Sequence, residues 1–326
     1  MRKGRKSLKK KVSLEFHSEL IFILFFLSIF LEMEKTHEGK EKLIKILLAF
    51  ISFVSIFILV SIIVFLLKES FYAIEEVGLF NLIFGVEWVP SEGKFGAFSF
   101  IISSIIITIV ALLIAVPFGV SCAILLSEIA NDKLKQIVRP AIELLAGIPS
   151  IVYGLFGLAI VVKFIKISFS LASGKTLLAG SIILAIMILP IIISISHDAM
   201  ERVPRTLREA SFSLGSTRWQ TIKNVVLPCA LPGIVASIIL AMGRAIGETM
   251  AVVLVLGNVE KLPTSLLEPG EALTSAILLE MGEVVIGSLH YSALFFLGVI
   301  LLTITFVLSL ISNYLIEKYE LVYARR

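Results

Sequence analysis

The sequence predicts an all-α, polytopic membrane protein with six transmembrane helices, and three observations support this fold class. Hydrophobic residues make up 58% of the 326 residues, and charged residues only 17%. The mean hydropathy is +1.01, so the chain holds more apolar side chain than one soluble core could bury. The apolar residues form continuous runs of about 20 residues, which favours a helical bundle over a barrel of alternating ten-residue strands.

Six windows are apolar enough to cross a bilayer, because a spanning helix needs about 20 mostly apolar residues. In chain order the predicted spans are Leu43–Leu67, Phe98–Leu126, Ala141–Phe164, Leu177–Ser196, Leu231–Leu256 and His290–Ile316. Proline lies close to glycine in two of them, and we expect these positions to kink the helices. The positions are Pro117 and Gly119 in the second span, and Gly147 and Pro149 in the third.

The distribution of Lys and Arg predicts that both termini are cytoplasmic. Fifteen basic residues lie in one set of connecting segments: Met33–Lys45, Asn131–Arg139, His197–Leu227 and the tail after Ile316. Only six lie in the alternate set: Lys68–Ala97, Lys163–Thr176 and Gly257–Leu289. The predicted organisation is an N-terminal extension (1–32), a first helix with an acidic outer loop (33–97), a core (98–316) and a cytoplasmic tail (317–326).

The N-terminal extension has seven Lys and Arg residues followed by a 12-residue apolar run, Leu20–Leu31. At about 1.5 Å per residue this run reaches about 18 Å, which is too short to cross a bilayer core. A seventh crossing would also place basic segments on the wrong side, and no small-residue cleavage site follows Leu31. We expect an interfacial helix, or an extension upstream of a start at Met33.

Cysteine and histidine spacing predicts no catalytic site and no metal site. The two cysteines, Cys122 and Cys229, have no partner spacing typical of a metal or redox pair, and the four histidines are scattered. Ser196, His197 and Asp198 are consecutive, so on a helix we expect them to point in different directions rather than to form a triad.

The stretch SGKT, Ser173–Thr176, has the ending of a phosphate-binding loop. The glycine that such a loop requires five residues before Gly174 would fall at Phe169, and the stretch lies on the predicted outer side. It is therefore a chance match. We expect this chain to bind no cofactor, so that any ATP is hydrolysed by another chain.

The fourth predicted connecting segment contains the stretch RTLREASFSLGSTRWQTIKNVVLPCALPGI, Arg205–Ile234. Its apolar residues recur at helical spacing, Gly215 interrupts them, and Pro228 and Pro232 mark the start of the fifth span. This pattern predicts two short amphipathic helices joined by a glycine turn. Two interpretations remain open, a solvated interfacial hairpin and a hairpin that docks into a groove on a cytoplasmic partner.

This stretch resembles the glutamate-alanine-alanine loop of ABC importer permeases. The matching residues are Glu209, Ala210, Gly215, Leu227 and Pro228. Ser211 replaces the second alanine, which is a small change. The resemblance implies a coupling loop over residues 205–228 that contacts an ATPase, and we place Arg218 in the same contact.

Three further stretches resemble the permeases of phosphate importers, specifically those of the PstC type. They are FGAFSFIISSIIITIVALLIAVPFGVSCAILLSEIA, ELLAGIPSIVYGLFGL and GRAIGETMAVVLVLGN. LTSAILLEMGE fits the outer segment before that family's last span, and the resemblance runs from about Gly93 to Tyr314. It implies a type I ABC importer permease fold in the cytoplasmic (inner) membrane, with one such chain forming half of a pathway for inorganic phosphate.

The same resemblance implies the partners of the chain. They are a second, PstA-like phosphate permease, two cytoplasmic ATPase subunits that bind ATP and Mg²⁺, and an extracytoplasmic phosphate-binding protein. ATP binding would close the ATPase pair and push on residues 205–226.

Arg244 is an arginine inside the fifth predicted span, where it costs roughly 2.5 to 3.5 kcal/mol on insertion scales unless it faces protein or water. Glu248 follows one turn later on the same predicted helix face. Small residues share that face: Gly233, Ala236, Gly243, Gly247 and Ala251. Because Gly243 and Gly247 would let another backbone approach closely, we expect this face to be a seam along a translocation path.

Two interpretations of Arg244 and Glu248 follow. The pair could be a purely structural ion pair. Alternatively, Arg244 offers a forked cation to phosphate oxygens while Glu248 orients it and lowers the net charge. A second acidic residue, Glu143, is expected near the inner end of the third span in a structural role, either reaching to the membrane interface or paired with Arg139 at i−4.

Other functions remain as alternatives. Within the same fold the substrate could be another oxyanion, such as sulfate or molybdate. From other classes, the chain could be a passive anion channel, which would conduct without an ATPase, or a membrane-embedded enzyme. An enzyme should place a nucleophile and a base together in a span, and the sequence shows no such pair.

Overall fold

The structure, a computed structural model, describes residues 37–324. The chain divides into two compact units, Met1–Phe65 and Leu66–Arg326. The described part of the first unit belongs to helix α2 (His37–Val77). The predictions for the N-terminal extension, including the apolar run and the start at Met33, lie outside the described residues.

Six helices of the described chain are long and apolar enough to cross a membrane, which confirms the predicted number. They are Lys42–Val77, Phe98–Ile129, Ser150–Ser168, Leu177–Glu201, Arg218–Ile246 and Leu289–Ile311. Three predicted spans have wrong boundaries, and the first of them ends at Val77 rather than at Leu67. The third span begins at Ser150 rather than Ala141, and the fifth runs from Arg218 to Ile246 rather than from Leu231 to Leu256.

Helices α4 (Phe98–Ile124), α8 (Leu177–Glu201) and α11 (Leu227–Ile246) pack together as the core of the second unit. Helix α8 is central, and its side chains include many that are fully buried. A Cβ on Gly119 of α4 would lie 2.7 Å from Ile192 Cγ2 of α8, so this glycine allows the two helices to approach closely.

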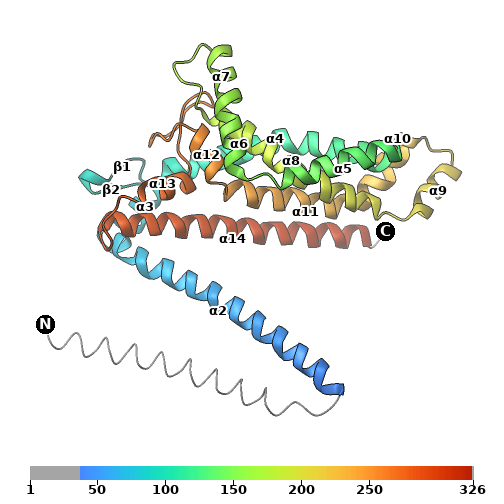
Figure 1. Ribbon diagram of the computed structural model, residues 1–326, viewed down its shortest axis with the longest axis horizontal. Helices are drawn as coiled ribbons and strands as arrows, with labels where there is room; N and C mark the ends of the chain where they lie inside the picture. The colour runs from blue at the N-terminus through green and yellow to red at the C-terminus, as the bar shows by residue number, and fades with distance from the viewer. Residues whose placement is uncertain (1–36, 325–326) are drawn as a thin grey trace. The chain divides into compact units, whose positions relative to one another are not determined.

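Helix α14 (Leu289–Ala324) lies alongside α11 (Figure 1). Within the first unit, by contrast, none of the described α2 side chains from Lys42 to Phe65 is buried. Apolar side chains left exposed along a helical segment of this length are typical of a segment that faces lipid or a second subunit.

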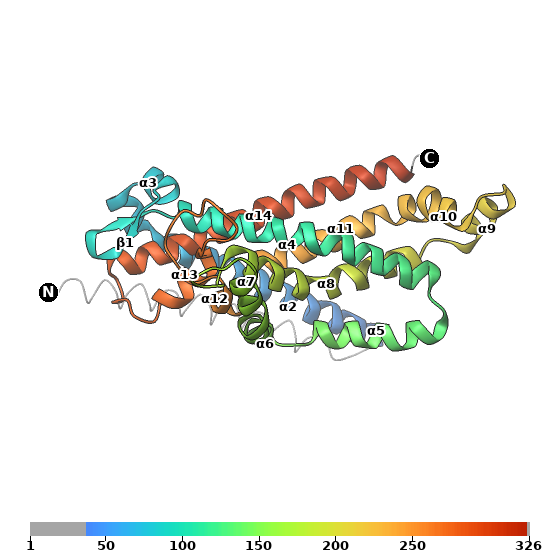
Figure 2. The ribbon, with the colours of Figure 1, turned by 90° about the horizontal axis from the view of Figure 1, so that it is seen from above.

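Small elements gather at the two ends of the second unit (Figure 1, Figure 2). The hairpin end carries α3 (Leu79–Phe84), strands β1 (Trp88–Val89) and β2 (Lys94–Phe95), and α13 (Leu273–Glu280). The opposite end, which we call the loop end, carries α9 (Arg205–Ser213) and α10 (Arg218–Thr221).

The segment expected only as an acidic loop contains the folded β-hairpin. Trp88 pairs with Phe95 across the two antiparallel strands, and the tryptophan is only 2% exposed. Its indole Nε1 donates to both carboxylate oxygens of Glu280, each 3.0 Å away. The other contact of this carboxylate is with His290 Nε2, at 2.5 Å, so Glu280 links the hairpin, α13 and α14.

The remaining elements complete the helices. The described part of the chain has three single π-helical turns. They are η2 (Leu125–Ile129) after α4, η3 (Gly157–Val161) between α6 (Ser150–Phe156) and α7 (Val162–Ser168), and η4 (Ile222–Val226) between α10 and α11. A 3₁₀ turn (Pro90–Glu92) joins the two strands. The other helices are α5 (Asp132–Ala146) and α12 (Met250–Val255).

The SGKT stretch serves the fold. Thr176 is the N-cap of α8, and its side-chain oxygen accepts a hydrogen bond from the Ala179 N–H at 3.2 Å. Gly174 packs against α7, where an added Cβ would lie 1.9 Å from the carbonyl oxygen of Val162. Capping and close approach therefore explain the threonine and the glycine of this stretch.

We expect Gly174→Ala to destabilise the protein by about 1 to 3 kcal/mol, a typical cost of overpacking. The clash is with a backbone carbonyl, which cannot rotate away as a flexible side chain can. The midpoint of thermal unfolding in detergent measures the effect. Gly282→Ala is the matched control, because a Cβ there meets nothing within 4 Å. Equal midpoints for the two variants would contradict the close approach of Gly174 to α7.

Candidate functional site

The predicted fifth span, Leu231–Leu256, is interrupted in the structure. Helix α11 ends at Ile246, the chain leaves helical geometry over residues 247–249, and α12 starts at Met250. The expectation that Arg244 and Glu248 share a face of one continuous helix is therefore wrong. Glycine at position 247 favours this termination, because glycine is among the poorest helix formers.

Glu248 forms hydrogen bonds with Ala251 and Thr274 rather than an ion pair with Arg244. Its Oε1 accepts a hydrogen bond from the Ala251 N–H at 3.2 Å, so the carboxylate caps the start of α12. Its carbonyl oxygen accepts from Thr274 Oγ1 of α13 at 2.8 Å. These two contacts satisfy polar groups that the interrupted helix leaves without intrahelical partners.

Arg244 lies exposed in the last turn of α11. It makes no hydrogen bond or ion pair with any described residue of the chain. An arginine inside a span that lacks a protein partner must face water or another subunit. All five N–H donors of its guanidinium are therefore available to a ligand or a partner chain.

The small residues of the predicted seam do not form one packing surface in the structure. A Cβ on Gly233 would lie 2.4 Å from Ala199 Cβ, so this glycine packs α11 against α8. Gly243 and Gly247 are exposed and meet no neighbouring helix of the described chain. The sequence therefore grouped residues that the structure separates. The exposed glycines lie beside Arg244 and leave this face of α11 open.

The predicted third span, Ala141–Phe164, is also interrupted, because α5 ends at Ala146 and α6 starts after Pro149. Here the expected kink is a full interruption, across which Tyr153 Oη donates to the carbonyl oxygen of Leu145 at 2.8 Å. A Cβ on Gly154 would lie 2.9 Å from Ala251 Cα, so α6 and α12 approach closely. The two short helices that follow the two breaks thus pack against each other.

Glu143 belongs to the amphipathic helix α5 and not to the third span, which corrects its predicted location. The predicted pairing is confirmed, since Arg139 Nε lies 3.3 Å from Glu143 Oε1. Arg139 Nη2 also lies 3.6 Å from Asp198 Oδ1 of α8. The arginine therefore joins α5 to α8 through two carboxylates.

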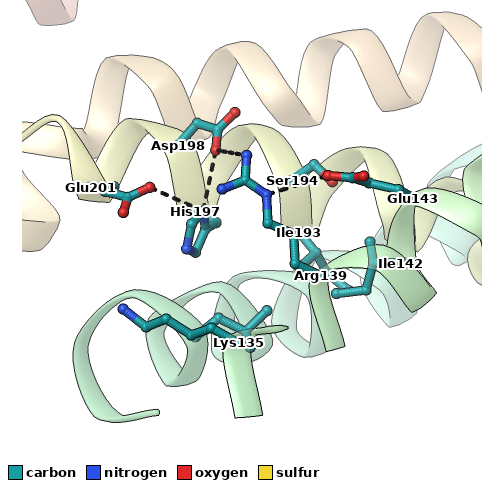
Figure 3. A pocket seen from close by; sticks show the side chains of 10 residues that line it. Lys135, Arg139, Ile142, Glu143, Ile193, Ser194, His197, Asp198 and Glu201 are labelled. Carbon is teal, nitrogen blue, oxygen red and sulfur yellow. Dashed lines mark hydrogen bonds and ion pairs between the residues drawn. The ribbon is translucent and has the colours of Figure 1, made fainter. Parts of the chain in front are cut away.

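A pocket of about 200 Å³ lies between α5 and α8 around this arginine (Figure 3). His197 Nδ1 lies 3.2 Å from Asp198 Oδ1 and 3.9 Å from Glu201 Oε2. Consecutive residues were expected to diverge, but the His197 ring and the Asp198 carboxylate meet beside Arg139. Side-chain atoms of His197, Asp198 and Glu201 that could bind a metal lie within 4.8 Å of one another. The group contains a single histidine, so the search of the sequence for clustered histidines did not reveal it. The Arg139 guanidinium already partners Asp198.

The hairpin at the loop end has the predicted glycine turn, with Gly215 at φ 83°. Its first helix is α9, on which Glu209 and Ala210 are exposed. The second predicted helix is not separate, because α10 continues through η4 into α11. Leu227 and Pro228 thus lie within a continuous helix, directly after the π-helical turn Ile222–Val226.

The hairpin exposes several large apolar side chains to its surroundings. Leu214 is 88% exposed and Trp219 is 60% exposed, and Arg218 lies beside the tryptophan. A contiguous apolar surface rimmed by polar side chains is typical of a protein-binding site. Of the two interpretations left open by the sequence, the exposed side chains favour docking.

Sequence reasoning missed two residues beneath the hairpin. Arg208 of α9 forms an ion pair with Glu128 of η2, 80 positions away, at 2.8 Å. The sequence offered no periodic signal for this contact, since it depends on how α4 packs beside α9.

At the hairpin end, three acidic side chains influence one another. Glu271 is only 3% exposed. Its burial, followed by the nearby charges of Glu280 and Glu260, raises the pKa of Glu271 to about 8. Burial also raises the pKa of Glu260. Glu271 is therefore protonated in the folded chain at neutral pH.

We expect Glu271→Gln to stabilise the protein at alkaline pH by about 2 kcal/mol. Below the unfolded pKa of about 4.5 the carboxyl is neutral in both states. As the pH rises from there towards 8, only the unfolded state releases its proton readily, so the wild type loses stability and glutamine does not. Thermal unfolding at pH 6 and pH 9 measures the difference. The exposed Glu283→Gln is the control, and parallel pH profiles for the wild type and Glu271→Gln would contradict the prediction.

Comparison with known proteins places the chain. Residues 115–320 match the model of the family described as "Binding-protein-dependent transport system inner membrane component". The "Probable ABC transporter permease protein YqgH" of Bacillus subtilis is 42% identical over 76% of this chain and 81% of its own length. The "Phosphate transport system permease protein PstC" of Mesorhizobium japonicum is 38% identical over 78% of this chain and 83% of its own.

Solved structures agree on the fold. A bacterial alginate ABC transporter in complex with a pentasaccharide-bound periplasmic protein matches with a TM-score of 0.56 and 17% identity, over 85% of this chain and 94% of the solved one. The methionine transporter MetNI in an inward-facing conformation matches with a TM-score of 0.54 and 20% identity, over 67% and 93%. The chain therefore has the type I ABC importer permease fold, and it belongs to the family of binding-protein-dependent transport system inner membrane components.

Proposed function

We propose that this chain is the transmembrane permease subunit of an ATP-driven importer of inorganic phosphate. The observation that carries the proposal is Arg244, an exposed guanidinium without a described partner beside a break in the fifth span. Planar guanidinium groups bind the oxygens of phosphate in a forked geometry. Several relatives named as phosphate transport permeases, 32 to 38% identical in the cases of Mesorhizobium japonicum and Methanocaldococcus jannaschii, support the choice of substrate.

The break itself supports a pathway at this position. Irregular backbone at membrane depth is tolerated where it lines a water-filled cavity or is buried in protein. In this chain Gly243 and Gly247, close to the break, are exposed, as is Arg244. We place the translocation path along this face, with Glu248 stabilising the break and one such chain forming half of the path. The exposed glycines would meet the second, PstA-like permease subunit.

Coupling to ATP requires other subunits. Within the described residues, the SGKT stretch serves as a helix cap and a packing contact rather than as a phosphate-binding loop. We propose that the loop-end hairpin docks onto one of two cytoplasmic ATPase subunits, which bind ATP and Mg²⁺, and that this chain binds no cofactor. Glu209, Gly215 and Arg218 would lie in that contact. An extracytoplasmic phosphate-binding protein would bind at the opposite end, which carries the β-hairpin.

This arrangement fixes an orientation. The loop end would be cytoplasmic, in agreement with the fifteen basic residues that the sequence places on that side. Both termini would then be cytoplasmic as well. Accessibility of cysteines introduced at Ser216 and at Ser91 to a membrane-impermeant reagent would test the orientation, with only Ser91→Cys labelled from outside.

The proposed function is tested by purification and reconstitution. The chain should co-purify with a second permease and an ATPase, and proteoliposomes that hold the complex should take up labelled phosphate only with ATP and a binding protein. Excess sulfate or molybdate should not compete. Competition by either would indicate a different oxyanion, and uptake without ATP would indicate a passive channel.

A further inference from the structure

Four segments converge at the loop end. They are the η2 end of α4, the last turn of α8, and the two helices of the hairpin, α9 and α10. Arg208 of α9 reaches into this junction, where its Nη2 lies 2.8 Å from Glu128 Oε1 and donates to the carbonyl oxygen of Met200 at 2.8 Å. Its Nη1 donates to the carbonyl oxygen of Val203. One guanidinium therefore holds α9 to both α4 and α8.

The ion pair is largely buried. The Arg208 side chain is 17% exposed and the Glu128 side chain 10%. Burial removes the screening that weakens surface pairs, and removal of one partner would leave an uncompensated charge. A rigid fork that satisfies three acceptors fixes an orientation better than a single flexible contact does. The position of α9 relative to α4 is therefore closely defined.

A second set of contacts continues the junction to the fifth span. Arg218 Nη2 donates to the carbonyl oxygen of Glu128, and Ser211 Oγ lies 2.9 Å from Thr221 Oγ1 between α9 and α10. Because α10 continues into α11, a displacement of α9 reaches both α4 and the helix that carries Arg244.

Both receiving helices have a π-helical turn at the point of contact. The turn η2 contains Glu128, and η4 follows directly after Thr221. Single π turns within α-helices are frequent at functional sites. At these two positions they would let a helix end shift while the rest of the helix stays intact.

We infer that Glu128 and Arg208 are positioning residues that pass the movement of the ATPase-docked helix α9 to α4 and α11. This inference rests on the proposed function, in which the hairpin contacts an ATPase. Neither residue needs to touch phosphate. Their part is to make the two helices follow α9, so that hydrolysis is matched to transport.

The test is the ratio of phosphate imported to ATP hydrolysed by the full reconstituted complex. Arg208→Gln should lower this ratio about tenfold or more, while the complex still assembles and hydrolyses ATP. Glu128→Gln should have the same effect. Glu128→Gln combined with Arg208→Gln should be no worse than either alone, because both act through one contact. Arg202→Gln, an exposed charge at the end of α8, is the control and should keep the wild-type ratio.

A merely structural junction would reduce the amount of assembled complex and leave the ratio of the remainder unchanged. That result in Arg208→Gln would overturn the inference. If Arg208→Gln fails to assemble, Arg208→Lys replaces it, since lysine keeps the charge but loses the fork. We expect about a threefold lower ratio, and an unchanged ratio would again overturn the inference. Absence of phosphate uptake by the wild-type complex would instead contradict the proposed function.

Discussion

Arg244→Gln is expected to abolish phosphate uptake while the complex still assembles and hydrolyses ATP. Glutamine keeps a polar side chain of similar reach but has neither the positive charge nor the forked donors. A desolvated charge-assisted contact with an anion is worth about 3 kcal/mol, which corresponds to about a hundredfold loss of uptake. Assembly should survive, because the Arg244 side chain makes no hydrogen bond or ion pair with a described residue. Uptake of labelled phosphate into proteoliposomes measures the loss.

The double variant Arg244→Gln with Glu248→Gln tests whether the arginine acts on its own. If the two residues mainly neutralised each other, removing both charges would restore transport. The structure gives Glu248 a different partner, the Ala251 N–H, so restoration is not expected. Glu248→Gln alone should distort the break only slightly, since the amide oxygen of glutamine can still accept the hydrogen bond from the Ala251 N–H. Near-normal phosphate uptake in the double variant would remove Arg244 from the pathway.

Gly215→Trp is expected to uncouple ATP hydrolysis from transport, lowering the phosphate imported per ATP about tenfold or more. Gly215 has φ 83°, a left-handed conformation that costs other L-residues about 1 to 2 kcal/mol. An added Cβ meets nothing within 4 Å in the chain. The chain should therefore still fold and insert, and the indole would obstruct the docking surface instead.

Gly215→Asn separates the backbone effect from the obstruction. Asparagine tolerates the left-handed conformation better than other side chains and is much smaller than tryptophan. We expect it to lower the ratio of phosphate to ATP less than tryptophan does. Wild-type coupling in Gly215→Trp, with normal binding of the ATPase, would count against the hairpin as the docking surface.

The sequence by itself determined the features that depend on local composition. Apolar runs of about 20 residues defined the number of spans, because burial in a bilayer depends on the hydrophobicity of each segment. The hairpin around Gly215 was also readable, since its helical periodicity and turn residue lie within a short stretch. The i−4 pairing of Arg139 with Glu143 follows from helix geometry alone and is confirmed.

Only the tertiary structure decided where the helices stop and which distant residues meet. A helix breaks where its freed backbone and capping groups find partners, and for Glu248 one partner is Thr274, 26 positions away. No periodic pattern in Leu231–Leu256 reveals a hydroxyl on another helix. No local pattern reveals the ion pair of Arg208 with Glu128 either, because it forms only when folding brings α9 and the end of α4 together. Long-range contacts also join the loop-end hairpin to the helix that carries Arg244.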